Sequence, residues 1–60
     1  MNEKQRAALK RVCERFNAPF DEEHYLPDPS CGDGWVAGWV GGKYKENIFV
    51  GCSPEGHVHS

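Results

Sequence analysis

Four side chains that can bind a transition metal lie in the second half of the sequence: Cys31, Cys52, His57 and His59. Four sulfur and nitrogen ligands suffice for a closed tetrahedral zinc site, and zinc would stabilise so short a chain. His57 and His59 are two residues apart, so on a strand both imidazoles lie on one face. The cysteines, however, lack the close C-x₂₋₄-C pairing of most structural zinc sites. A zinc-stabilised domain is therefore one hypothesis, and buried thiols with histidines at a surface rim are the simpler interpretation.

Catalysis has weaker support from the same residues. A cysteine nucleophile needs a base and an orienting third group in a cleft, and 60 residues leave little room for a cleft beside a core. The adjacent carboxylates of Asp21, Glu22 and Glu23 fall in a predicted loop, where nothing fixes their separation. We therefore expect no enzymatic activity and no cofactor.

The charges are segregated along the chain, although the net charge is only −2. Residues 1–17 carry five basic and two acidic side chains, whereas residues 18–34 carry five acidic side chains and no basic one. The simplest interpretation is that the two segments attract each other within the fold. Two alternatives are that Lys4, Arg11 and Arg15 on one helical side bind nucleic acid, or that the acidic segment imitates a phosphate backbone. A pI of about 5.8 argues against a nucleic-acid-binding domain, which usually has a clear basic footprint.

Length and composition predict one small domain. A chain of 60 residues buries only about 60% of its unfolded surface, so a partner, metal or cross-link would contribute much to its stability. The odd number of cysteines, three, indicates free thiols in a reducing compartment. No apolar run approaches the ~20 residues that span a bilayer, and residues 1–16 are too charged for a secretory signal. We expect a complete cytoplasmic protein that does not contact the membrane.

Residues 2–16 are predicted to form an amphipathic helix. Asn2 suits the N-cap and Gln5 completes a capping box three residues later. Asn17 tolerates the left-handed conformation that ends helices, and Pro19 stops the helix from continuing. One apolar stripe is formed by Leu9, Val12, Cys13 and Phe16. Residues 17–34 are predicted to be a long loop anchored by Phe20, Tyr25 and Leu26.

The second half predicts a three-stranded antiparallel meander, which makes the fold class α+β. Residues 35–40 and 47–52 are rich in aromatic and β-branched side chains. The Ser53–Gly56 segment has the Pro and Gly placement of a tight turn, after which residues 57–59 return as a short third strand.

Alternation along these strands separates two apolar faces. One is predicted to be aliphatic and covered by the helix, and it carries Val36, Val40, Ile48, Val50, Cys52 and Val58. The other carries Trp35, Trp39 and Phe49, with the histidines at its edge. Because one helix cannot cover two faces, either loop 17–34 folds over the aromatic residues or they meet a partner. A one-residue shift in register would exchange the faces.

The C-terminal half resembles a group of small uncharacterised proteins encoded by actinobacterial phages. The resemblance is carried by residues 34–42, GWVAGWVGG, and residues 48–60, IFVGCSPEGHVHS, and it extends through Pro19-Phe20-Asp21. The group has no assigned activity, so the resemblance implies no catalytic residue. Cys52 stands where such proteins are expected to have an aliphatic residue, which counts against an essential thiol or metal. The resemblance implies a phage accessory protein that acts on a host protein in the bacterial cytoplasm.

The sequence thus predicts a non-enzymatic protein-interaction module. We expect its contact surface to contain Trp35, Trp39 and Phe49, with Tyr44, His57 and His59 at the rim. The partner would be a host protein or a second copy of the chain. Large exposed apolar patches mark such sites, and tryptophan is enriched at their energetic centres. A nucleic-acid-binding domain that uses the basic helix and a small zinc-stabilised domain are the alternatives.

Overall fold

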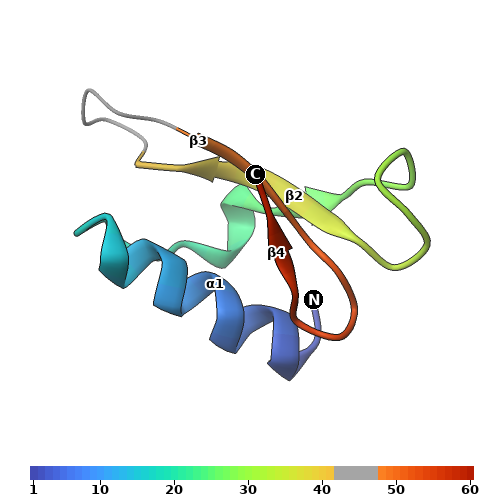
Figure 1. Cartoon of the computed structure of the whole chain (residues 1–60), viewed down its shortest axis with the longest axis horizontal. Helices are drawn as coiled ribbons and strands as arrows, with labels where there is room; N and C mark the ends of the chain where they lie inside the picture. The colour runs from blue at the N-terminus through green and yellow to red at the C-terminus, as the bar shows by residue number, and fades with distance from the viewer. Residues whose placement is uncertain (42–47) are drawn as a thin grey trace.

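A computed structural model describes residues 1–41 and 48–60 and has the α+β class that the sequence predicts (Figure 1). Helix α1 (Glu3–Arg15) is followed by a short 3₁₀ helix, η1 (Glu22–His24). The described residues also form four strands: β1 (Leu26–Pro27), β2 (Val36–Val40), β3 (Ile48–Cys52) and β4 (Val58–His59). In the described part of the chain, no helix has the length and apolar character needed to cross a membrane.

The predicted caps of helix α1 are confirmed, although the helix ends at Arg15, one residue before the predicted end. The Asn2 side chain accepts a hydrogen bond from the Gln5 amide at 2.8 Å, and the Gln5 side chain accepts one from the Asn2 amide at 2.9 Å. This reciprocal capping box pairs two amides that a helix leaves unbonded at its start. At the other end, Asn17 adopts a φ of 53°, the left-handed conformation that ends the helix.

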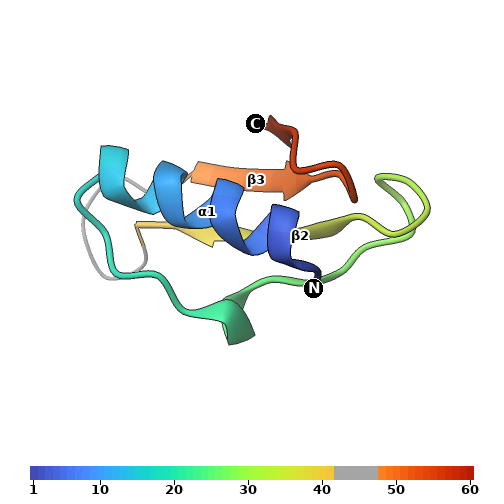
Figure 2. The same cartoon turned by 90° about the horizontal axis from the view of Figure 1, so that it is seen from below.

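The sheet is antiparallel throughout, with strand order β1-β2-β3-β4. In its centre Val36 lies opposite Cys52 and Val40 opposite Ile48, while Trp39 lies opposite Phe49. Directly opposed residues share a face, so this register separates the aliphatic and aromatic side chains as the alternation predicts. Helix α1 lies across one face of the sheet (Figure 2), and the aliphatic side chains point toward it.

The prediction of three strands and an irregular 17–34 loop is wrong. Within that segment Asp21 caps η1, and Leu26 and Pro27 pair with Ala37 and Val36 as a fourth, edge strand. Proline is tolerated there because alternate residues of an edge strand form no hydrogen bonds to the sheet, so the missing amide hydrogen of Pro27 costs none. Residues 26–27 therefore extend the sheet sideways and leave Trp39 and Phe49 exposed, while Cys31 reaches the same side of the sheet beside Gly51.

The loop anchors separate to opposite sides of the sheet. Tyr25 is buried beside α1, where its hydroxyl lies 3.4 Å from the Cys13 sulfur, and the Phe20 ring stacks against it at 5.9 Å. Desolvation, followed by this contact with Cys13, raises the pKa of Tyr25 above its usual range. Leu26 points the other way and is exposed.

The core lies between α1 and the sheet. It consists of Leu9, Cys13, Tyr25, Val36, Val40, Val50 and Cys52. Val12 packs against its edge. Phe16, predicted as the last residue of the apolar stripe, is instead exposed, because the helix has ended at Arg15 and Phe16 has non-helical backbone angles.

Candidate functional site

The sheet face that α1 does not cover carries a pair of exposed aromatic rings. Trp39 and Phe49 are directly opposed on β2 and β3, and their rings meet edge to face with centroids 5.2 Å apart. Even so, 56% of Trp39 and 46% of Phe49 remain exposed. We call the surface formed by Trp39, Phe49, Trp35, Leu26 and His59 the aromatic face.

Trp35 lies at one end of this face and is only partly exposed. Its indole lies over Gly51, where an added Cβ would meet the ring at 3.4 Å, and beside the His59 ring at a centroid distance of 5.3 Å. A Cβ on Gly32 would overlap the indole nitrogen at 2.5 Å. Two glycines thus leave the space that the Trp35 indole occupies at this end of the aromatic face.

Leu26 extends the aromatic face at the other side of the sheet. It pairs with Ala37, which shares a face with Trp39, and 64% of Leu26 is exposed. Leu26 is predicted as an anchor of the loop, but the structure places it in the site. The signal was the Leu26-Pro27 pair. A residue before a proline is restricted to extended conformations, and proline itself is tolerated in an edge strand.

The structure places the three predicted rim residues, Tyr44, His57 and His59, in different positions. His59 lies on β4 next to Trp35, as predicted. His57 is exposed in the turn before β4, where its amide donates to the Ser53 hydroxyl oxygen at 3.1 Å. Tyr44 lies outside the described residues.

The four candidate zinc ligands do not converge. Cys52 is fully buried on the helix side of the sheet, whereas Cys31 is exposed and its sulfur lies close to Trp35 and Gly51 on the aromatic face. The sheet itself therefore separates the two thiols. No group of three or more histidine, cysteine or acidic side chains suited to a metal occurs among residues 1–41 and 48–60.

We expect one of the three thiols to be alkylated in the folded protein. Cys31 is exposed, while Cys13 and Cys52 are buried. Partial desolvation and the hydrogen bond to the Asp28 carboxylate raise the pKa of Cys31, so its labelling should need a more alkaline pH than an ordinary thiol. Asp28→Asn should accelerate labelling at pH 8 because it removes the charge that opposes the thiolate. Labelling with iodoacetamide followed by intact mass spectrometry measures both effects. Two labelled thiols in the native protein would contradict the burial of Cys13 and Cys52.

The basic side chains of α1 lie on two flanks. On the flank facing η1, the Arg6 guanidinium contacts Glu22 at 2.6 Å, and this hydrogen bond keeps the pKa of Glu22 below its usual range. The Lys10 ammonium lies 5.7 Å from the centre of the Phe20 ring. These contacts support attraction between the basic helix and the acidic segment. On the opposite flank, Arg11 and Arg15 line a groove beside β4.

Comparison with known proteins found no relative: no family model, curated protein or solved structure matches this chain.

Proposed function

We propose that this protein binds another protein through the aromatic face and has no catalytic role. The observation that carries the proposal is the exposure of Trp39 and Phe49 side by side on a regular sheet. Burying each half-exposed ring would remove about 100 Å² from water, or roughly 2–3 kcal/mol at 25 cal/mol per Å². Rigid aromatic side chains lose little entropy on binding, which is why they dominate interface energetics.

The charge at the Trp35 end of the aromatic face favours a partner with an apolar site next to basic residues. The loop between β1 and β2 ends at Trp35 and contains Asp28 and Asp33 but no lysine or arginine. Hydrogen bonds from Ser30 and then Cys31 lower the pKa of Asp28, so this carboxylate stays charged in neutral solution. A fixed negative charge beside an apolar patch speeds encounter with a basic partner and selects against acidic ones.

The resemblance to phage-encoded proteins extends the proposal to a bacterial host protein in the cytoplasm. This extension rests on the resemblance in residues 34–42 and 48–60 and in the Pro19-Phe20-Asp21 segment. It predicts that lysate from an actinobacterial host contains the partner.

Trp39→Ala should weaken partner binding at least tenfold while the protein stays folded. The reason is that the ring contributes to the exposed face and not to the buried core, so its removal loses contact area without opening a cavity. Affinity capture from host lysate, followed by titration of the captured protein, measures the loss. Melting by circular dichroism should shift by no more than a few degrees.

Phe16→Ala is the matched control, because Phe16 is an exposed aromatic residue at the end of α1, at 44% exposure. It should leave partner binding unchanged. If Trp39→Ala unfolds the chain, Trp39 belongs to the folding core and the proposal is wrong. If the protein dimerises with concentration and Trp39→Ala abolishes the dimer, the aromatic face binds a second copy of the chain. That result would overturn the proposal that it binds a different protein.

A further inference from the structure

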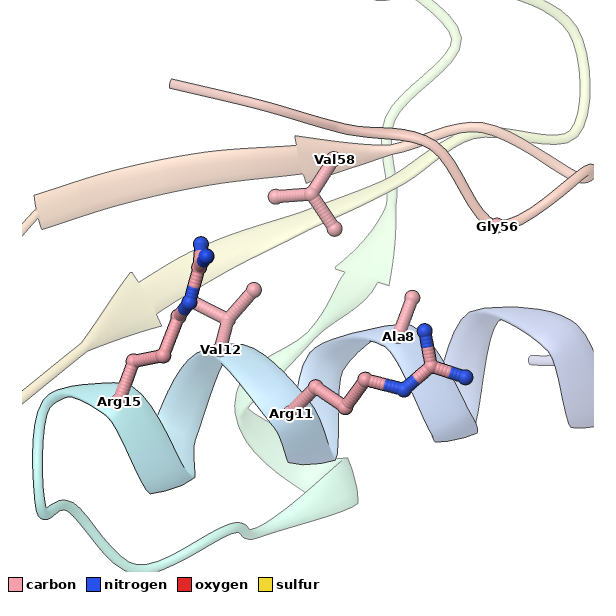
Figure 3. Close-up of a pocket in the computed structure, with 6 residues that line it drawn as sticks. All are labelled: Ala8, Arg11, Val12, Arg15, Gly56 and Val58. Atoms are coloured by element: carbon pink, nitrogen blue, oxygen red, sulfur yellow. The ribbon is translucent and has the colours of Figure 1, made fainter.

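A second surface lies on the helix side of the sheet, away from the aromatic face. It is a shallow groove of about 290 Å³ between α1 and the β4 hairpin (Figure 3). The lining residues are Ala8, Arg11, Val12, Arg15, Gly56 and Val58. Figure 3 shows Val12 and Val58 pointing toward each other across it, with the Arg15 side chain beside Val12 and the Arg11 side chain extending past Ala8. The groove therefore combines a narrow apolar floor with two positive charges.

The edge of β4 beside this groove has backbone groups that the sheet does not use. The Ser53 amide donates to the His57 carbonyl at 2.9 Å, and Cys52 lies opposite Val58. Because hydrogen bonding alternates along an antiparallel strand, His57 and His59 direct their backbone groups toward β3. Val58 directs its amide and carbonyl away from the sheet. Within the described residues β4 is the last strand of the sheet, so this edge is open to another strand.

Arg11 and Arg15 are one helical turn apart on the flank that faces β4. Neither forms an ion pair within residues 1–41 and 48–60, where the only pairs involve Arg6 and His24. Four residues of helix rise about 6 Å, which is comparable with the roughly 6.8 Å between alternate residues of an extended strand. Two acidic side chains at alternate positions of one strand therefore match the spacing of Arg11 and Arg15 along the helix axis.

We propose that the groove binds an extended acidic peptide segment of a partner protein, which adds to the sheet as a strand beside β4. The backbone of the segment pairs with the amide and carbonyl of Val58. Alternate side chains face α1, where their carboxylates pair with Arg11 and Arg15 and their methylene groups contact Val12. Main-chain pairing supplies affinity in this mode of binding, and the pockets beside the strand supply specificity.

A peptide fits this surface better than a nucleic acid does. Among the residues that the structure describes, two basic side chains line the groove, whereas nucleic-acid binding usually draws on a broader basic surface. Of the remaining bases on α1, Arg6 is paired with Glu22 on the other flank. A nucleic acid would also make no use of the open strand edge.

The test is an NMR titration of the isotope-labelled protein with a blocked nine-residue peptide that alternates glutamate and threonine. We expect saturable shifts at the Val58 amide and the two arginine side chains. The Arg11→Gln/Arg15→Gln double variant should weaken binding about tenfold, as expected for two exposed charge pairs. Lys10→Gln removes one positive charge from the other flank of α1, and it should change the affinity less than twofold.

Three further titrations separate the alternatives. A glutamine peptide of the same length should bind about tenfold more weakly, and a glutamate peptide N-methylated at alternate residues on its pairing edge should not bind. Trp39→Ala should bind the acidic peptide normally, so this result is independent of the aromatic face. Equal binding of the methylated peptide, or no saturable shift at all, would overturn the proposal. Tighter binding of a ten-nucleotide thymidine strand would also overturn it, in favour of a phosphate site.

Discussion

Gly38→Ala should destabilise the protein by about 3–4 kcal/mol, although it adds only one methyl group. A Cβ at this position would overlap the His24 carbonyl oxygen and lie 2.7 Å from the Tyr25 ring. The backbone of η1 and the Tyr25 side chain therefore lie directly over the centre of β2. Overpacking a core usually costs 1–3 kcal/mol, and more when rigid backbone must move. At about 0.05–0.15 kcal/mol per residue, a domain of this size has only about 3–9 kcal/mol in total.

Gly51→Ala is the matched control for this prediction, because Gly51 lies in the neighbouring strand and faces the aromatic side. A Cβ there would meet the Trp35 ring at 3.4 Å, an ordinary contact that a surface side chain can accommodate. Urea denaturation should show a loss below about 1 kcal/mol for Gly51→Ala. Equal stability of the two variants would mean that the segment containing η1 does not pack on β2.

The helix and the two faces of the sheet were predictable because their determinants are local and periodic. The start of α1 is marked by the hydrogen bonds between Asn2 and Gln5, three residues apart. Its end is marked by Asn17, a residue type that tolerates the left-handed conformation. The aromatic face follows from strand alternation in Trp35–Val40 and Ile48–Cys52 once the register is fixed. The Trp39–Phe49 pairing shows that no one-residue shift exchanges the faces.

The position of segment 17–34 was not predictable, because it depends on contacts between distant parts of the chain. Phe20, Tyr25 and Leu26 are similar as apolar residues, yet only the first two pack on the helix side. Their separation depends on Leu26 and Pro27 pairing with β2. The space for Tyr25 depends on Gly38, thirteen residues further along the chain. Neither contact leaves a periodic pattern in the sequence.

Part of the candidate site was predictable for the same reason. Trp39, Phe49, Trp35 and His59 share a face through alternation alone. Leu26 joins them through the edge pairing, and the open edge at Val58 depends on which residues of the β3–β4 hairpin exchange hydrogen bonds. Sequence thus indicates the chemical character of a sheet face more readily than its extent.

Gln5 links three parts of the fold, although its sequence position indicates only a helix cap. It is 2% exposed, and its side-chain amide donates to the Gly34 carbonyl at 2.9 Å and to the Cys52 carbonyl at 3.3 Å. The same side chain accepts from Asn2 at the start of α1. One amide therefore fixes the beginning of the helix against the entry to β2 and the end of β3.

Gln5→Ala should lower the free energy of unfolding by about 3 kcal/mol. It removes part of the cap, worth about 1 kcal/mol, and it leaves carbonyl groups without their donor, at about 1–3 kcal/mol for each one that stays buried. For a domain of this size, that loss lowers the melting temperature by about 12–24 °C. Thermal unfolding followed by circular dichroism measures the change.

Two variants separate the cap from the link to the sheet. Asn2→Ala removes the capping side chain and its exposed hydrogen bond to the Pro54 carbonyl, but it keeps both bonds from Gln5 to the sheet, so it should cost only about 1–2 kcal/mol. Gln5→Glu keeps an oxygen that can accept from the Asn2 amide, but in neutral solution it offers a carboxylate to two carbonyl oxygens. It should therefore destabilise the protein at least as much as Gln5→Ala. If instead Gln5→Glu were as stable as the original chain, Gln5 would act only as a cap, and the orientation of α1 would have to depend on apolar contacts such as those of Leu9.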